Sequence, residues 1–183
     1  NNTTYADYYV GIAPPAPVEA NLTCTLGPVL LSSTATIDQP AGGGGIVGDD
    51  TAGTDSFPGS GNRALLSDFI MPADGDLVMG YLRFEATTTA GASAKFLVYA
   101  DNGSGLPGSL LYASAGVSIP AGASTQSFVL DVPGLTSGQR IHIGGVTNSH
   151  EASWNCDGSG GLSRFEGMSY ASPNATWTES GTA

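Results

Sequence analysis

The residues that could carry out catalysis in this sequence are two histidines, His142 and His150, together with many serines and acidic residues. A Ser-His-Asp hydrolase with a nucleophile elbow places its serine in a G-x-S-x-G turn between a strand and a helix, and the sequence contains no such turn. We interpret His142 as a half-exposed strand residue. We interpret His150, in NSHEASWNCD, as a loop residue with a local hydrogen bond. We therefore expect no enzymatic activity.

Three acidic residues are candidates for calcium binding. Asp49, Asp50 and Asp55 lie in one Gly-rich segment, and Ca²⁺ takes several oxygen ligands that a loop can supply. The segment lacks the D-x-D-x-D-G spacing of a calcium-binding loop, so a solvated acidic loop is the competing interpretation. We expect no metal and no other cofactor.

Three aromatic residues near the C-terminus are candidates for sugar binding. Trp154, Tyr170 and Trp177 occur in a region rich in loop-forming residues, where exposed rings could stack on a pyranose. The competing interpretation is that these rings close the end of the fold and contribute core area.

The two cysteines, Cys24 and Cys156, are far apart in the sequence. Two cysteines without neighbouring histidines cannot form a four-ligand zinc site by themselves. They either form a disulfide that ties the N-terminal segment to the rest of the chain, or remain two separate buried thiols.

The N-terminal segment, residues 1–38, combines aromatic residues with closely spaced prolines. Prolines at this spacing favour an extended conformation and remove backbone donors, while the aromatic rings need a surface to bury against. We expect an extended arm that can include a strand, whose rings contact the domain itself or, in an assembly, a neighbouring subunit. The partner-binding candidates are Tyr5, Tyr8, Tyr9, Pro14, Pro15 and Pro17.

The rest of the chain has the composition of a β protein. It contains 27 Gly, 11 Pro and only 11% charged residues, which leaves little of what surface helices need. After a Gly-rich loop at 39–62, apolar and β-branched segments between Gly/Pro turns predict strands at 63–72, 76–88, 94–101, 108–119, 125–133 and 140–148. We predict an all-β fold, with an antiparallel two-sheet sandwich over residues 63–183.

Two details support the sandwich. In TQSFVLDVP, Phe128, Leu130 and Val132 share one face of the predicted strand, so one side can meet a core. The stretch DNGSGLPGS at 101–109 lies between two predicted strands and consists of turn-forming residues. We interpret it as a turn.

The charge balance limits the partners. Sixteen acidic residues against five basic ones give a net charge of −11, and the basic residues do not form the patch that binding to phosphates requires. The same scarcity of Lys and Arg argues against an anionic membrane surface. No apolar stretch approaches the ~20 residues of a membrane-spanning helix. We expect neither nucleic acid nor a membrane as a partner.

A family resemblance is carried by strands and turns between residues 62 and 177. Tyr-Ala-Asp at 99–101 ends an apolar strand, and a Gly-rich turn, Leu-Pro-Gly at 106–108 and Leu-Thr-Ser-Gly at 135–138 follow. This pattern resembles a jelly-roll-like β-sandwich module that recurs in phage virion proteins and bacterial surface proteins. The resemblance implies a structural or adhesive module, with no enzymatic motif.

These observations lead to two functional hypotheses. The first is a non-enzymatic structural protein on the surface of a virion, most simply a phage capsid decoration or head-surface protein. It would dock on capsid or tail subunits through its N-terminal arm and form a homo-oligomer such as a trimer. The alternative is a carbohydrate-binding adhesin module of a tail fibre or cell-surface protein, which would be extracellular.

Overall fold

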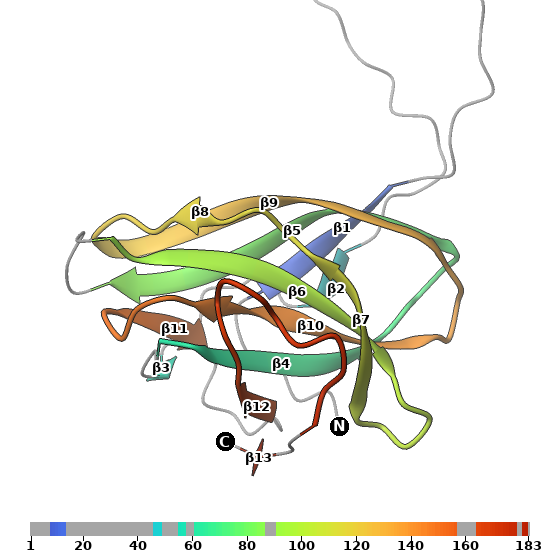
Figure 1. Cartoon of the computed structure of the whole chain (residues 1–183). Coiled ribbons are helices and arrows are strands. Elements are labelled where there is room, and N and C mark those ends of the chain that lie inside the picture. The colour runs from blue at the N-terminus through green and yellow to red at the C-terminus, as the bar shows by residue number, and fades with distance from the viewer. Residues whose placement is uncertain are drawn as a thin grey trace, which may run out of the picture.

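The computed structural model describes residues 8–13, 46–48, 55–57, 61–86, 91–156, 164–178 and 181–182. Within these ranges the regular elements are strands, and all their pairings are antiparallel (Figure 1). In chain order they are β1 (Tyr8–Ala13), β2 (Ile46–Gly48), β3 (Asp55–Phe57), β4 (Arg63–Ile70), β5 (Gly75–Ala86), β6 (Ser93–Asp101), β7 (Pro107–Ala113), β8 (Val117–Ser118), β9 (Gly122–Leu135), β10 (Arg140–Thr147), β11 (Ala152–Cys156), β12 (Arg164–Gly167) and β13 (Gly181–Thr182). The predicted all-β, two-sheet sandwich is confirmed.

The first sheet is organised around β5. Its order is β2-β1-β5-β11-β3, and β9 also pairs with β5. β9 pairs with β5 along its whole length, from Gly75↔Leu135 to Ala86↔Gly122, and β1 pairs with the other edge of β5 from Asp76 to Leu82. At the end of this edge, Phe84–Ala86 of β5 pair with β11 in place of β1. One long strand thus holds the N-terminal strand, the long β9 and the β11–β3 pair in one layer.

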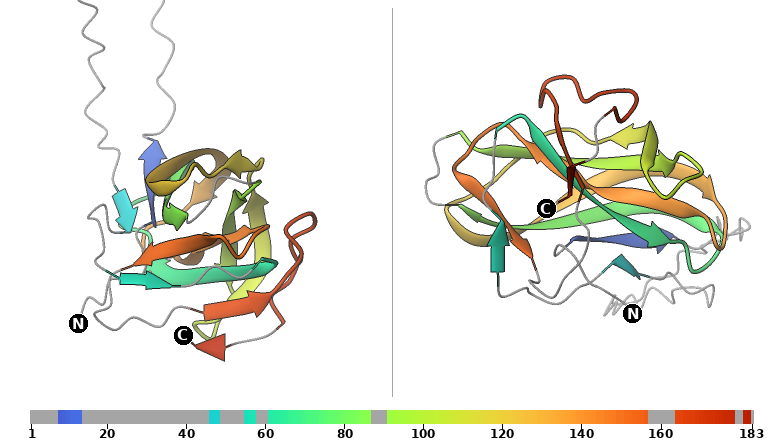
Figure 2. Two further views of the ribbon diagram at one scale, coloured as in Figure 1. Left: turned by 90° about the vertical axis from the view of Figure 1, so that its left-hand side faces the viewer. Right: turned by 90° about the horizontal axis from the view of Figure 1, so that it is seen from below.

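The second sheet has the order β13-β12-β4-β10-β6-β7, with β8 also paired to β6. Its centre is regular, since β10 pairs with β4 from Arg140↔Ile70 to Thr147↔Arg63 without a register shift. Figure 2 shows how this sheet and the first sheet lie as two layers when the molecule is turned. Because side chains alternate across a strand, each strand of this sheet sends one set of residues toward the first sheet and one set outward.

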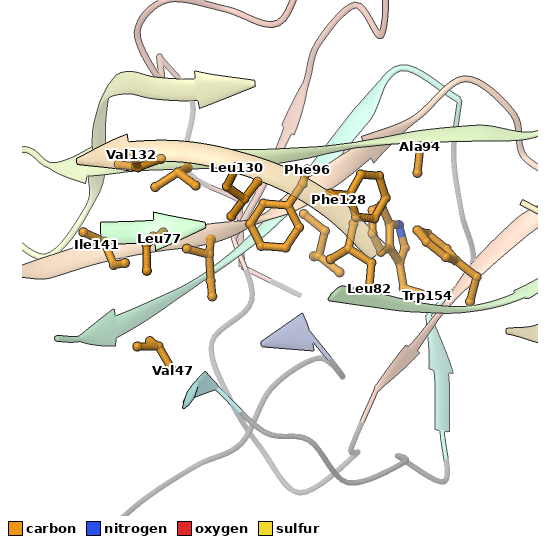
Figure 3. Packing of buried hydrophobic residues seen from close by; sticks show 14 of the residues in the cluster. Val47, Leu77, Leu82, Ala94, Phe96, Phe128, Leu130, Val132, Ile141 and Trp154 are labelled. Atoms are coloured by element: carbon orange, nitrogen blue, oxygen red, sulfur yellow. The ribbon is translucent and has the colours of Figure 1, made fainter. Parts of the chain in front are cut away.

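The main core lies between the two sheets (Figure 3). The alternation predicted for β9 is confirmed, because Phe128, Leu130 and Val132 are buried while Val129 is 72% exposed. Phe128 packs against Phe96 of the opposite sheet, with ring centroids 5.8 Å apart. Burial of such aromatic and aliphatic side chains is the main favourable term in folding.

A second apolar cluster lies on the outer face of the second sheet, the face turned away from the first sheet. It is covered by residues 168–178, called the strap here and drawn in red in Figure 1. The side chains beneath and within it are Ala64, Leu66, Leu97, Tyr99, Val146, Met168 and Trp177. This sheet is therefore buried on both faces over much of its centre.

The double burial corrects one expectation. His142 was predicted to be half exposed because it alternates with Ile141 and Ile143, but its side chain is fully buried. The prediction treated the outer face of β10 as solvated. In the structure that face belongs to the layer beneath the strap, and the carboxylate of Asp101 is hydrogen-bonded to Nε2 of the ring.

Candidate functional site

The N-terminal strand enters the sandwich at a defined place. β1 pairs with β5, with Tyr9 opposite Tyr81 and Ala13 opposite Asp76, and it pairs with β2 through Gly11↔Ile46. β1 ends at Ala13 and β2 begins at Ile46, so the two strands that flank residues 14–45 are paired with each other. Residues 14–45, called the insertion here, are thus anchored at both ends by paired strands.

This placement divides the predicted partner-binding residues. Tyr8 and Tyr9 belong to β1, so their backbone lies within the first sheet. Tyr5 and the three prolines Pro14, Pro15 and Pro17 lie outside the described residues. Of the predicted arm 1–38, only β1 is described, and it is part of the sandwich.

The structure does not bring the predicted sugar-binding aromatics together. Trp154 is 3% exposed and lies in the main core, where its ring centroid is 4.9 Å from that of Phe84. Trp177 is 8% exposed and packs edge-on against Tyr99 in the outer cluster. Tyr170 is half-buried, with the Lys95 ammonium 4.9 Å from its ring centroid. Neither indole offers a free face for stacking on a sugar.

The remaining predicted residues are the two cysteines and the three aspartates of the calcium hypothesis. Cys24, Asp49 and Asp50 lie outside the described residues, and Cys156 is the cross-strand neighbour of Asp55 at the β11–β3 pairing. Across the described ranges, no group of three or more His, Cys, Asp or Glu residues could hold a metal ion. In the same ranges no helix is long and apolar enough to cross a membrane.

The strap is fixed by buried polar contacts. Glu166 of β12 is 1% exposed, and its carboxylate accepts hydrogen bonds from Asn174 Nδ2 at 2.7 Å and from the hydroxyl and backbone N–H of Thr178. Tyr99 donates its hydroxyl to the backbone oxygen of Asn174 at 2.7 Å. Burial, and then the negative charge of Glu166, raise the pKa of Tyr99 well above its usual value. Tyr99 therefore stays neutral and acts as a donor.

Two pairs of titratable side chains lie on the outer face where β4, β10 and β6 meet. His142 Nε2 lies 3.1 Å from Asp101 Oδ2, and Arg140 forms an ion pair with Asp68. We call these four residues the charged cluster. Register explains the arrangement: His142 is directly opposite Asp68 on β4 and Tyr99 on β6, and Asp101 is two residues beyond Tyr99.

Asp101 also organises the turn that follows it. Its Oδ1 accepts the backbone N–H of Gly103 at 2.7 Å and that of Gly105 at 3.4 Å. Both glycines have positive φ, which other residues rarely adopt. The predicted turn at 101–109 is thus tied to the sheet through one carboxylate that contacts the turn with one oxygen and His142 with the other.

The surroundings lower the pKa of both His142 and Asp101. Burial lowers the pKa of His142, and the opposing effects of Asp101 and Asp68 do not restore it; Arg164 on β12 adds to the lowering. Burial pulls the pKa of Asp101 upward, but hydrogen bonds from His142, Gly103 and Gly105 outweigh burial and lower it overall. At neutral pH the pair is therefore a neutral imidazole that donates to a carboxylate.

This geometry suits a structural role better than catalysis. The ring of His142 is enclosed, and among the described residues its Nδ1 has no hydrogen-bond partner. A general base must reach the proton that it abstracts, and a fully buried imidazole does not meet a substrate in this conformation. The role of the charged cluster is structural: through Asp101 it holds the 101–106 turn against β10.

The buried histidine predicts a pH-dependent stability. Because the pKa of His142 is lower in the folded chain, the unfolded chain binds more protons below about pH 6.5. The free energy of unfolding should therefore decrease as pH falls from about 6.5 to the folded pKa, by at most about 1.4 kcal/mol per pH unit for one proton. His142→Gln should flatten this part of the profile in urea unfolding curves.

The matched control is His150→Gln, because His150 is exposed. This variant should keep the slope of the parent chain. The contribution of Asp101 is separate. Because the pKa of Asp101 is lower in the folded chain, this carboxylate stabilises the fold above the pKa of an unfolded aspartate, and the stabilisation is lost as pH falls through the folded pKa. An unchanged slope between about pH 5 and 6.5 in His142→Gln would contradict the buried, neutral state of His142.

Sequence reasoning missed the charged cluster. Asp101 was interpreted only as part of a turn, and Asp68 and Arg140 entered only the count of acidic and basic residues. The available signal was that Asp101 directly follows an apolar strand and that His142 lies inside one. The pairing itself depends on the register between β6 and β10, which join residues 41 positions apart.

Comparison with known proteins adds no further constraint. No family model, no curated protein and no solved structure matches this chain. Its fold and its candidate site therefore have to be interpreted from the residues themselves.

Proposed function

We propose that this chain is a non-enzymatic structural protein of a virus particle, most simply a phage capsid decoration protein displayed on the head surface. Its proposed partners are capsid or tail subunits and further copies of itself, as a homo-oligomer such as a trimer. The contact to the particle is made by the N-terminal third, which includes Tyr5 and the prolines of the insertion.

One observation supports this proposal above the others. The strands that flank the insertion, β1 and β2, are paired through Gly11↔Ile46 in a sheet whose next strand is β5. A segment of 32 residues anchored in this way can be presented to a partner without loss of the sandwich that carries it. Its sequence includes three prolines within four positions and the apolar run PVLLSSTATI. Such a segment gains more from contact with another subunit than from solvent.

The adhesin alternative has less support from the geometry. Trp154 and Trp177 are buried in two different clusters, so a stacking platform would require both to leave their packing. Removing large buried aromatics from their clusters costs several kcal/mol. We therefore do not extend the proposal to carbohydrate binding.

The experiment replaces the insertion with a short Gly/Asn turn that joins Ala13 to Ile46. Because β1 and β2 keep their pairing, we expect the melting temperature to stay close to that of the parent chain. Co-sedimentation with virus particles purified from the source of the sequence should fall to background. A second variant, with a Gly/Ser linker of the same length in place of the insertion, should also fail to bind.

The two variants separate sequence from length. Undiminished binding by both would remove the proposed role of the insertion. Binding by the Gly/Ser variant alone would show that the segment acts only as a spacer, which also contradicts docking through its side chains. The parent chain in the same gradient, without particles, controls for aggregation.

A further inference from the structure

The turn at residues 101–106 carries a second kind of chemistry, which does not depend on the proposed function. Asn102 is followed by Gly103, and both residues are exposed. The backbone nitrogen that follows an asparagine can attack the side-chain amide carbon, and a glycine leaves that nitrogen unhindered. A Cβ atom at Gly103 would meet no other atom within 4 Å, so the space beside the Asn102–Gly103 peptide bond is open.

Two hydrogen bonds prepare this attack. Asp101 Oδ1 accepts a hydrogen bond from the backbone N–H of Gly103 at 2.7 Å. The backbone N–H of Ser104 donates to Asn102 Oδ1 at 2.9 Å. A carboxylate on the attacking nitrogen is placed as a general base, and a donor on the amide oxygen is placed where negative charge develops in the tetrahedral intermediate.

We propose that Asn102 is a site of self-catalysed deamidation. The Gly103 nitrogen forms a bond to Asn102 Cγ, and its proton passes to Asp101 Oδ1. The bond from Cγ to Nδ2 then breaks, and ammonia leaves with the proton that Asp101 returns. The resulting succinimide is hydrolysed by water at either carbonyl, which leaves aspartate or isoaspartate at position 102. Asp101 ends in its original state, and no oxidant or cofactor is consumed.

The rest of the turn holds the reacting groups in place. Asn102 donates its backbone N–H to Leu106 O at 2.9 Å, which closes the turn. The second oxygen of Asp101 is hydrogen-bonded to the buried His142. His142 belongs to β10, which pairs with β6. The base is thus fixed to the sheet, and the target is fixed to the turn. Holding reactants in one geometry is itself a large part of rate enhancement.

The product differs from the parent chain in charge. Deamidation of Asn102 adds a carboxylate at the residue that follows Asp101, which itself contacts His142. An added negative charge favours the protonated imidazole. The aged protein should therefore carry one more negative charge and, in the isoaspartate form, a backbone lengthened by one atom within the turn.

The experiment incubates the purified full chain in H₂¹⁸O at neutral pH and maps label by peptide mass spectrometry. We expect label at position 102 to accumulate faster in the folded chain than in the same chain unfolded in urea. Asn148 is the internal control, because it is also exposed and its Oδ1 also accepts a backbone N–H, from Ser93, but it is followed by Ser149 in place of a glycine. It should take up label much more slowly.

Two variants isolate the role of the carboxylate. Asp101→Ala should lower the rate at position 102 about tenfold, a modest part of what a positioned general base contributes. His142→Gln leaves Asp101 against Gly103 but removes the contact that fixes its second oxygen, so its rate should fall between those of the parent chain and Asp101→Ala; His150→Gln, at an exposed position outside the turn, should keep the parent rate. Folding of all three variants is checked by their melting curves. Labelling that is no faster in the folded chain than in urea, or an unchanged rate in Asp101→Ala, would overturn the proposal.

Discussion

Replacing Trp154 with alanine is expected to lower the free energy of unfolding by about 3–5 kcal/mol, the range for removal of a large buried aromatic side chain. Trp154 is 3% exposed and packs against Phe84 in the main core. The backbone of Trp154 is paired with Phe57 on one side and Phe84 on the other, which limits how far β11 can move to fill the resulting cavity. For a chain of this size the melting temperature should fall by about 6–20 °C.

The matched control is Val129→Ala. Val129 is 72% exposed on β9, so its truncation should change stability by less than about 0.5 kcal/mol. Calorimetry of the two variants beside the parent chain measures the difference. An unchanged melting curve for Trp154→Ala, together with a loss of glycan binding, would contradict the core position of this ring and would revive the adhesin alternative.

Replacing Gly144 with alanine is expected to be the most damaging single-atom addition in the second sheet. Gly144 lies in the middle of β10, opposite Leu66 on β4 and Leu97 on β6. A Cβ at this position would lie well inside van der Waals contact with the backbone oxygen of Leu65. Because the obstacle is backbone of a paired strand, the sheet itself must separate. We expect a loss at the upper end of the about 1–3 kcal/mol that overpacking costs, or beyond it.

Gly167→Ala provides the comparison for this substitution. Gly167 is also a strand residue, at the end of β12, but a Cβ there would meet no atom within 4 Å. The same chemical change should be neutral, or stabilising by up to about 1 kcal/mol through the unfolded state. Urea unfolding of both variants gives the two values. Equal effects would mean that Gly144 does not lie where β4 and β10 pair.

The strands of the body could be predicted from the sequence because their signals are local. The predicted strand at 76–88 corresponds to β5 at Gly75–Ala86, and the one at 140–148 corresponds to β10 at Arg140–Thr147. Alternating side chains and Gly/Pro turns fix such segments within a few residues. The predicted strand at 108–119 is the exception, since it is divided into β7 and β8. At the break, Ser114 Oγ accepts the backbone N–H of Phe96.

The N-terminal strand could not be assigned from local pattern. Tyr8–Ala13 is directly followed by two prolines, which cannot donate to a ladder and so favour an arm over a strand. β2 and β3 have three residues each, too few for alternation to be recognised. Their place in the sheet depends on pairing with β1 and β11, which are distant in sequence.

The site was harder to predict because it depends on register. Whether His142 meets solvent or a carboxylate depends on how β10 aligns with β6 and on whether the strap covers that face. Trp177 and Trp154 likewise have similar surroundings in the sequence but are separated into two clusters by the sheet between them. A shift of one residue in a strand moves every side chain to the other face, so these contacts cannot be derived from composition.

The most direct test of the proposed role is hydrogen exchange measured by mass spectrometry on the protein free and bound to its particle. The account predicts that binding slows exchange in residues 14–45 and at the adjoining ends of β1 and β2. It predicts no change in β4 and β10, which are paired and buried and are therefore expected to exchange slowly in the free protein as well. Protection confined to the strap and the 101–106 turn, with the insertion unchanged, would contradict docking through the N-terminal third.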